Sequence, residues 1–459
     1  MKTVLILAYE CAPYHRPGSV IGAQRPYQFA KHLPKFGWRA IVLCCDFSGR
    51  YFLDPREHWE LIVKKEVSEK LSNGKSHQSL TIPLPSLRFA DIFDKIWLSS
   101  VFFDKIKGTF SAKPNFWNGL KRKITSFIKL FRGDHSQSWQ KVAFYASEVI
   151  LELGEKIDII IAEHGPDAGV FIAHQLNSKK GIPWIIDFRD PLLVGKNKFV
   201  HFILKLYFKQ LFNSCEGLIN VTPYWSELDS VLFPKLSCYC IPNGYDEEEF
   251  QKLKKTTFSK GISLYYFGSI KSGQSFKILF QALQFINNSF PEKFDHFEFN
   301  YNGPSKDIVL AEKKEFCPSL SGSIGDSIDR RLTFEIASQC DILILLSRQE
   351  DNIYFRKGFY PGKVFEYFGF KKLIIVLPSD KKLLDALIKE TSAGETFDNP
   401  YSLANYLEKC LEMKKKGIPL FDPNDLSVGK YTRKYQSKQL AEVLSRALGQ
   451  EMKLDQVEP

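Results

Sequence analysis

The strongest constraint in this 459-residue sequence is the alternation of short apolar runs with segments of helical periodicity, repeated along almost the whole chain. Short β-branched and leucine-rich runs that alternate with helical patterns are typical of parallel strands joined by crossover helices. The candidate strands are residues 4–8, 40–44, 158–162, 184–187, 218–221 and 239–241 in the first half, and 264–267, 297–300, 342–346 and 374–377 in the second. The pattern predicts an α/β fold with two doubly wound parallel sheets, one after the other.

The length of the chain also favours two domains, because one hydrophobic core rarely supports so many residues. A polar, lysine-rich stretch, DEEEFQKLKKTTFSK, follows the turn signal PNG and precedes the next strand, which marks it as the boundary. We therefore expect three parts: an N-terminal domain over 1–248, a C-terminal domain over 260–430, and a helical C-terminal segment over 431–459 that packs back on the N-terminal domain.

The composition is that of a folded soluble protein, with 44% hydrophobic and 25% charged residues. The start MKTVLILAYECAP lacks the features of a signal peptide, and no stretch reaches the ~20 apolar residues of a membrane-spanning helix. The nine cysteines lack the spacing of a zinc site, which favours reduced thiols over disulfides or a structural metal. We expect a cytoplasmic protein.

The net charge of +11 indicates an anionic partner: nucleic acid, an anionic membrane or a phosphorylated substrate. No recognisable DNA- or RNA-binding motif accompanies the charge, so we expect no nucleic-acid partner. Part of the charge lies in an aromatic and basic helical insertion at about 87–138, most sharply in FWNGLKRKITSFIKLFRG. This amphipathic segment, 116–132, either contacts an anionic membrane peripherally or packs its apolar face on its own domain.

The first candidate strand leads into a loop and helix that could bind an anion. Gly18 and Gly22 would let a phosphate or sugar approach the main chain, and free N–H groups at a helix start attract negative charge. We place Pro26 in the first turn of that helix. Arg25 then either pairs with a phosphate or carboxylate of a substrate or holds a neighbouring strand end.

Two further strands of the first half end in polar clusters, and ligands of open α/β sheets bind beyond the carboxyl ends of strands. His164, in EHGPDAG, is a candidate proton donor, partner of a sugar hydroxyl or ordinary polar cap. The string DFRDP offers Asp187, Arg189 and Asp190. The D-F-R-D spacing suggests an internal Asp–Arg pair that orients one member toward a substrate, or a structural ion pair.

In the second half, two strand-to-helix turns could also bind an anion. Gly268, Ser269 and Lys271 lie in a turn suited to a phosphate. In GFYPGKVFEYFG the N–H groups after Gly362 face an anion, Lys363 adds a positive charge and Glu366 follows about one turn later. Such a pair could hold a pyrophosphate and a ribose diol together, or it could be a surface Lys–Glu pair.

Together these segments resemble GT-B glycosyltransferases, specifically the retaining family 4 (glycosyl transferases group 1). The resemblance spans nearly the whole chain, in the order GAQRPYQFAKHLPKFGW, GIPWIIDFRDP, VTPYW, IPNGYDEEEF, FGSIKSG and PGKVFEYFGFKKLIIVLP. It implies the GT-B architecture, two facing Rossmann-like domains with a cleft between them. It also implies a hexosyltransferase-like enzyme whose nucleotide-diphosphate sugar binds mainly to the second domain.

The resemblance further implies an acceptor bound mainly to the first domain, a glycan or lipid-linked precursor of the cell envelope, and transfer with retained anomeric configuration. Glu366 corresponds to the second glutamate of the family's E-x7-E motif, which binds the donor ribose. No cofactor or metal is implied, because cationic side chains and helix N-termini neutralise the diphosphate. His164, Arg189 and Asp190 are the candidate catalytic residues.

The sequence departs from the family's pattern at three positions. Gly358 stands where the first glutamate of the motif would be, and Ser269 and Gln274 stand where an arginine and a lysine usually hold the pyrophosphate. The candidate replacements are Lys271, Lys277 and Lys363. Two alternatives to a transferase therefore remain open: a nucleotide-sugar epimerase of the same architecture, and a degenerate nucleotide-sugar-binding partner protein.

Overall fold

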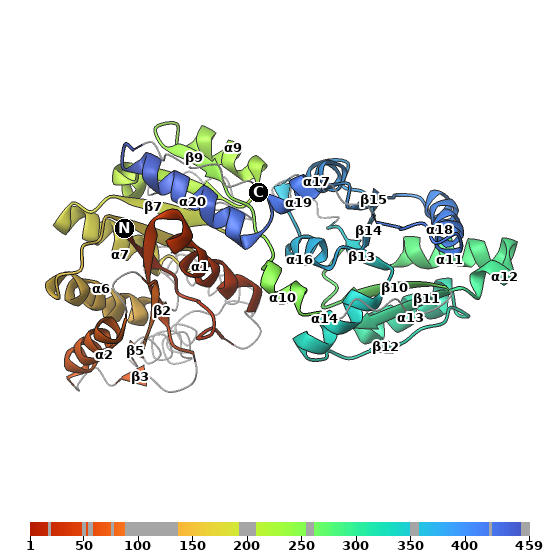
Figure 1. Cartoon of the computed structure of the whole chain (residues 1–459), viewed down its shortest axis with the longest axis horizontal. Helices are drawn as coiled ribbons and strands as arrows, with labels where there is room; N and C mark the ends of the chain where they lie inside the picture. The colour runs from red at the N-terminus through yellow and green to blue at the C-terminus, as the bar shows by residue number, and fades with distance from the viewer. Residues whose placement is uncertain are drawn as a thin grey trace, which may run out of the picture. The chain divides into compact units, whose positions relative to one another are not determined.

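The computed structural model describes residues 1–16, 20–47, 52–53, 58–74, 78–87, 136–191, 208–253, 261–348, 358–421 and 425–450. The chain divides into two compact units (Figure 1). The first contains Met1–Ile241 and a C-terminal segment that begins at Ser437, and the second contains Pro242–Gln436. The division thus falls just before the lysine-rich stretch. Gly18 and most of the predicted insertion, 88–135, lie outside the described residues.

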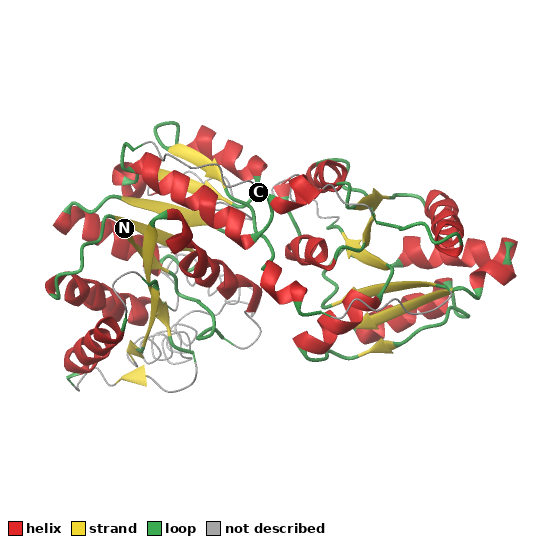
Figure 2. Ribbon diagram, in the orientation of Figure 1, coloured by secondary structure: helices red, strands yellow, loops and turns green. Residues whose placement is uncertain are grey.

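The first unit is built on a seven-stranded parallel sheet in the order β4-β2-β1-β6-β7-β8-β9. Figure 2 draws the strands in yellow and the helices around them in red. Its strands are β1 (Lys2–Leu7), β2 (Trp38–Cys45), β4 (Leu80–Leu84), β6 (Ile159–His164), β7 (Trp184–Phe188), β8 (Gly217–Asn220) and β9 (Ser237–Cys240). The short strands β3 (Phe52–Leu53) and β5 (Ser86–Leu87) pair separately. In chain order the sheet grows outward from β1 in both directions, so its topology reverses between β1 and β6.

Helices cover both faces of this sheet, because alternate side chains of each strand enter two separate cores. Leu5 and Leu7 pack with helices α2 (Trp59–Asn73), α6 (Gln137–Glu152) and α7 (Ala168–Lys180). Val4 and Ile6 pack with α1 (Val20–His32) and with α20 (Arg433–Ala447), from the end of the chain. The other helices of this unit are η1 (Leu33–Phe36), η2 (Phe212–Ser214) and α9 (Pro223–Leu232).

The second unit contains a six-stranded parallel sheet in the order β12-β11-β10-β13-β14-β15, the usual Rossmann order. Its strands are β10 (Ile262–Phe267), β11 (Phe297–Asn302), β12 (Ile324–Gly325), β13 (Ile342–Leu346), β14 (Leu373–Leu377) and β15 (Gly394–Thr396). The reversal here falls between β10 and β13. Both predicted doubly wound sheets are therefore confirmed.

Two helical layers cover the second sheet as well (Figure 1). One core contains side chains of α11 (Lys277–Ser289), α12 (Pro291–Phe294), α13 (Lys306–Phe316) and α18 (Pro400–Lys415). The other contains side chains of α14 (Arg330–Gln339), α16 (Gly362–Phe370), α17 (Leu383–Thr391) and α19 (Asp425–Gly429), with Phe250 of α10 (Glu247–Gln251) packed against it.

All ten strands predicted from apolar runs are present, but β4, β12 and β15 of the two sheets and the short strands β3 and β5 were not predicted. The sequence of β4, LTIPL, is short and contains Pro83. Proline has no N–H to donate to a neighbouring strand, and β4 is an edge strand that pairs only with β2. The position of Pro26 was also predicted wrongly, because α1 begins at Val20 and so has this proline in its interior. No helix among the described residues is long and apolar enough to cross a membrane.

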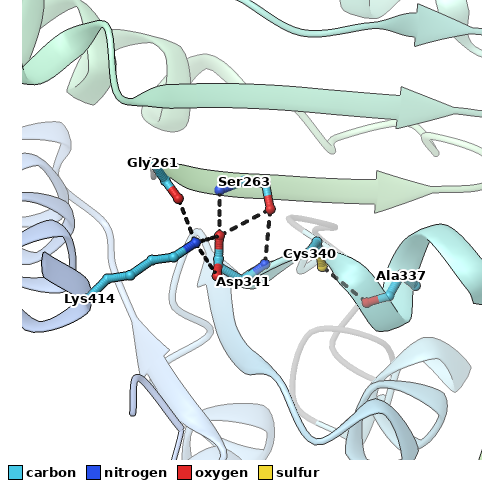
Figure 3. Close-up of polar contacts among 6 residues, drawn as sticks. All are labelled: Gly261, Ser263, Ala337, Cys340, Asp341 and Lys414. Carbon is cyan, nitrogen blue, oxygen red and sulfur yellow. Dashed lines mark hydrogen bonds and ion pairs between the residues drawn. The ribbon is translucent and has the colours of Figure 1, made fainter. Parts of the chain in front are cut away.

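A largely buried ion pair lies at the amino-terminal ends of the central strands of the second sheet (Figure 3). The ammonium of Lys414, from α18, donates to both carboxylate oxygens of Asp341 at 2.7 Å and to the carbonyl oxygen of Gly261 at 2.6 Å. Oδ2 of Asp341 also accepts hydrogen bonds from the amide and hydroxyl of Ser263. The network therefore ties α18 to the starts of β10 and β13, at the edge opposite the strands' carboxyl ends.

Replacing Lys414 with methionine should lower the free energy of unfolding of the second unit by about 3–5 kcal/mol, because Asp341 would stay buried without its counter-charge. Urea denaturation followed by circular dichroism measures the loss. Lys415→Met is the matched control, since Lys415 is exposed and lies 4.0 Å from Glu412. Its loss should stay below about 0.5 kcal/mol. Equal losses in the two variants would contradict the role assigned to Lys414.

Candidate functional site

Two sets of polar side chains lie where each topology reverses, at the carboxyl ends of the strands. One set belongs to the first unit and follows β1, β6, β7 and β8. The other belongs to the second unit and surrounds the ends of β10 and β13 and the start of α16. The two sets are described separately below.

In the first unit, Arg25 and Asp187 form a buried bidentate ion pair. Nε of Arg25 donates to Oδ2 of Asp187 at 2.7 Å, and Nη2 donates to Oδ1 at 2.9 Å. Both side chains are almost fully buried, and the guanidinium also lies over the ring of Phe29. Of the two roles considered for Arg25, the structure assigns the one that joins α1 to the end of β7.

A second buried pair joins Arg189 to Glu163. Nη1 of Arg189 donates to Oε1 of Glu163 at 2.6 Å. The internal Asp–Arg pair suggested by D-F-R-D was thus wrong, because Asp187 and Arg189 each pair with a residue elsewhere in the chain. Gly22 leaves room for this pair, because a Cβ atom there would meet Nη2 of Arg189. Gly22 therefore allows the Arg189 side chain to approach the main chain, whereas the sequence suggested the approach of a phosphate or sugar.

The charges of this second pair affect each other's pKa values. Burial raises the pKa of Glu163, and Arg189 only partly offsets that effect. Burial alone would lower the pKa of Arg189, but the adjacent Glu163 carboxylate more than compensates and raises it. Asp190 is exposed beside them.

His164 lies at the end of β6, in register with Phe188 of β7 and Asn220 of β8. Its ring contacts Phe188 edge to face, with 4.8 Å between centroids. Nδ1 lies 2.5 Å from Oδ1 of Asp167, without the alignment of a hydrogen bond. Nearby, the amide of buried Asn220 donates to Asp229 at 3.1 Å, and burial raises the pKa of Asp229 to about 6. The sequence analysis did not identify Asn220 or Asp229.

In the second unit, two stacked tyrosines hold the turn after β10. The hydroxyl of Tyr301 donates to the carbonyl oxygen of Gly268, and that of Tyr266 donates to the carbonyl oxygen of Ser269, each at 3.0 Å. The two rings are nearly parallel, with 6.0 Å between centroids. Gly268 has φ +96°, which favours glycine. The carbonyl oxygens of Gly268 and Ser269 therefore accept hydrogen bonds from tyrosine side chains of the same unit.

The rest of this turn is held by Gln274. Its side-chain oxygen accepts from the amide of Lys271 at 2.8 Å, and its side-chain nitrogen donates to the carbonyl oxygen of Leu346 at 2.7 Å. The amide thus fixes the turn against the end of β13. The Lys271 side chain is exposed.

Lys363, in the first turn of α16, directs its ammonium across the same turn. Nζ donates to the hydroxyl of Tyr266 at 2.8 Å and lies 4.1 Å from the centroid of that ring. A Cβ atom on Gly268 would lie 2.9 Å from Nζ, so a larger residue there would require the lysine side chain to shift. Burial lowers the pKa of Lys363 to about 8; Glu366 opposes this decrease and Lys271 adds to it. A partly buried cation therefore lies at the carboxyl end of β10.

Glu366 is largely buried one turn further along α16 and forms an ion pair with Arg330 of α14, Nη1 to Oε1, at 2.9 Å. The simple surface Lys–Glu pair considered from the sequence is therefore not what forms. Gly362 is the first residue of α16, and no side chain caps this helix start. The second unit thus combines a helix start whose N-cap residue, Pro361, makes no side-chain capping bond, a partly buried cation and a buried carboxylate.

Arg330 and Tyr266 were not predicted as site residues from the sequence, because each contacts a partner that is far away along the chain.

Gly18 lies outside the described residues, so its predicted role is untested. Among the described residues, no group of three or more His, Cys, Asp and Glu side chains could hold a metal ion.

Comparison with solved structures identifies the fold. A glycosyltransferase from Rickettsia africae is 13% identical, with a TM-score of 0.56 over 97% of this chain and 98% of that one. HepE of Anabaena in complex with UDP is 12% identical, with a TM-score of 0.54 over 97% and 100%. The N-terminal domain of Candida albicans trehalose-6-phosphate phosphatase is 10% identical, with a TM-score of 0.56 over 97% of each chain. The predicted GT-B fold is confirmed.

The sequence itself adds no further relative. No protein-family model matches the chain, and no curated protein matches it by sequence.

Removing the cation beside Glu163 should make stability depend on pH. In Arg189→Met the carboxyl is buried without a partner, so its pKa rises further and the folded state prefers the protonated form. Stability is then kept at low pH and lost as pH rises through the folded-state pKa. We expect a loss of about 3–5 kcal/mol near pH 7 and a much smaller loss near pH 4. Urea titrations of wild type and variant at both pH values measure this difference.

The control for that prediction is Lys156→Met. Lys156 is exposed and pairs with Asp158 on the amino-terminal side of β6. Its effect should be small at both pH values. A loss in Arg189→Met that does not change between the two pH values would show that the carboxylate charge of Glu163 is not its cause.

Proposed function

We propose that this protein is a retaining glycosyltransferase of family 4 that transfers a sugar from a nucleotide-diphosphate sugar to an acceptor. The observation that carries the proposal is the arrangement at the start of α16. Lys363 and Glu366 lie one turn apart on this helix, at the carboxyl edge of a Rossmann sheet, beside the Gly268 turn. Nucleotides bind to that edge of such sheets.

The donor roles follow from this geometry. The diphosphate would occupy the N-terminus of α16, where the helix dipole, the Gly362 amide and the Lys363 ammonium favour negative charge. Glu366 would accept hydrogen bonds from the ribose hydroxyls. Gly268, Ser269 and Lys271 would line the phosphate side of the site. Lys363 is the best-placed replacement for the cations that the family usually supplies after β10, because Gln274 is engaged in holding the turn.

We assign the acceptor to the polar edge of the first unit. His164 and Asp190 would contact acceptor hydroxyls, with Arg189 held by Glu163 beside them. No protein nucleophile is needed, because the leaving diphosphate can receive the proton of the acceptor hydroxyl as the new glycosidic bond forms. The cationic and helix-terminal groups around Lys363 would stabilise that leaving group without a metal ion.

Two complexes of one structural neighbour are consistent with this donor. The Anabaena protein HepE has been solved with UDP and also with UDP-glucose, the latter with a TM-score of 0.52 to this chain. A uridine diphosphate sugar is therefore the first donor to test. We further propose a lipid-linked or polysaccharide precursor as acceptor and a cytoplasmic enzyme that contacts an anionic membrane peripherally through residues 116–132, which lie outside the described residues.

Calorimetric titration with UDP, GDP and ADP near pH 7 tests the donor site. Lys363 stays cationic there because its pKa is about 8. Wild type should bind at least one of the three, and Glu366→Ala should weaken that binding by about 10-fold or more, because a hydrogen bond to a charged group is lost. Glu335→Ala is the control, since Glu335 is a partly exposed carboxylate paired with Arg331.

Four outcomes test the donor site and separate the candidate functions. Absence of binding at millimolar nucleotide would contradict any donor site, and equal affinity in Glu366→Ala and wild type would remove Glu366 from the ribose role. Isomerisation of a UDP-sugar without any acceptor would identify an epimerase. Nucleotide binding without transfer to lipid-linked acceptors would favour a binding protein, as Gly358 and Ser269 suggest.

The membrane contact can be tested by flotation with anionic vesicles. Wild type should float with the vesicles, and Phe127→Glu should not, because a charge would enter the apolar stripe of the segment. Ser126→Glu adds the same charge on the opposite side of the expected helix and should reduce flotation only slightly. Absence of flotation in wild type, or equal flotation of both variants, would contradict this part of the proposal.

A further inference from the structure

Arg330 connects two carboxylates of the second unit that are far apart in the sequence. Its Nη1 donates to Oε1 of Glu366 on α16 at 2.9 Å. Its Nε and Nη2 donate to the two carboxylate oxygens of Glu249 on α10, at 3.0 and 3.2 Å. The guanidinium therefore uses all three of its nitrogens in ion pairs.

An aromatic ring also holds the Arg330 guanidinium in place. The guanidinium lies over the ring of Phe334, 4.1 Å from the centroid, and this ring packs against Phe250 and Phe370. Arg330 is the first residue of α14, and Asp329 caps that helix by accepting from the amide of Arg331 at 2.7 Å. A planar group held by three hydrogen bonds and an aromatic face has little freedom to rotate.

Because Arg330 is held in place, its hydrogen bond also restrains the Glu366 side chain. The contact with Arg330 uses Oε1, so it restrains the position of the carboxylate and leaves Oε2 as the oxygen better placed to accept from a ligand hydroxyl. Placement of that oxygen matters, because a hydroxyl pair is recognised only when the acceptor lies within hydrogen-bond distance of it. A carboxylate in mobile contact with solvent would recognise the same pair less well.

We propose that Arg330 is a positioning residue that fixes the Glu366 carboxylate for recognition of a ribose diol, so that the site distinguishes ribonucleotides from 2′-deoxyribonucleotides. This inference rests on the proposed function, in which Glu366 receives the ribose. Arg330 itself touches no part of the sugar. Its effect is on discrimination, whereas a cation that served only to attract phosphates would affect both kinds of nucleotide equally.

The test compares calorimetric affinities of the full-length protein for UDP and 2′-deoxy-UDP, or for the corresponding pair of whichever nucleotide binds. Wild type should prefer the ribonucleotide by about 10-fold or more, the effect of one hydrogen bond to a charged group. Arg330→Met should reduce this preference to about 2-fold, mainly through weaker binding of the ribonucleotide.

Arg330→Lys separates position from charge. Lysine keeps the positive charge but cannot bridge two carboxylates as a planar fork does. We expect this variant to fold and to lose the preference nearly as fully as Arg330→Met. Arg331→Met is the matched control: this arginine is the next residue of α14, is exposed and pairs with Glu335. It should keep the wild-type preference.

Each outcome bears on one statement. An unchanged preference in both Arg330 variants, or an equal loss of affinity for both nucleotides, would overturn the positioning role and leave the proposed function intact. A preference that persists in Glu366→Gln would overturn the assignment of Glu366 to the ribose. Failure of wild type to bind any of UDP, GDP and ADP would overturn the proposed function, and this inference with it.

Discussion

A charged side chain that is removed from water must be neutralised close by, and this constraint organises the carboxyl edges of both sheets. In the first unit, Asp187 receives Arg25 from α1, and Glu163 receives Arg189 from the loop after β7. In the second, Glu366 receives Arg330 from α14. Each pair joins the end of a strand or the start of a helix to another element, so the edges that would bind ligands are also the edges held together by charge.

Sequence periodicity predicted most strands of the two sheets but none of these pairs. The ten strands could be predicted because each contains a short apolar run, and apolar runs are local. The partner of Arg189 could not be predicted from D-F-R-D, because proximity in the sequence favoured Asp187 or Asp190 whereas the sheet register brings Glu163 of the neighbouring strand beside Asp187. Likewise, Lys363 was identified from the PGK turn, but its contact with Tyr266 depends on how β10 and α16 pack.

In the turn after β10, neutral hydroxyl groups as well as the Lys363 ammonium make the local environment more positive. Tyr266 and Tyr301 engage the carbonyl groups of Ser269 and Gly268, which removes two negative dipole ends from the surface that a diphosphate would approach. The ammonium of Lys363 then lies across a glycine that leaves room for it. The orientation of the backbone therefore adds to the positive character that Lys363 gives this turn.

The path of α20 has a practical consequence for dissecting the molecule. The chain leaves the first unit after Ile241 and returns to it at Ser437, where Leu440 and Leu444 enter the core that covers Val4 and Ile6. Two peptide connections therefore join the units, and cleavage of one would leave them covalently linked by the other. A fragment that stops at Ile241 would expose to water the part of one apolar sheet face that α20 covers. Separate production of the units would need the last helix grafted back onto the first.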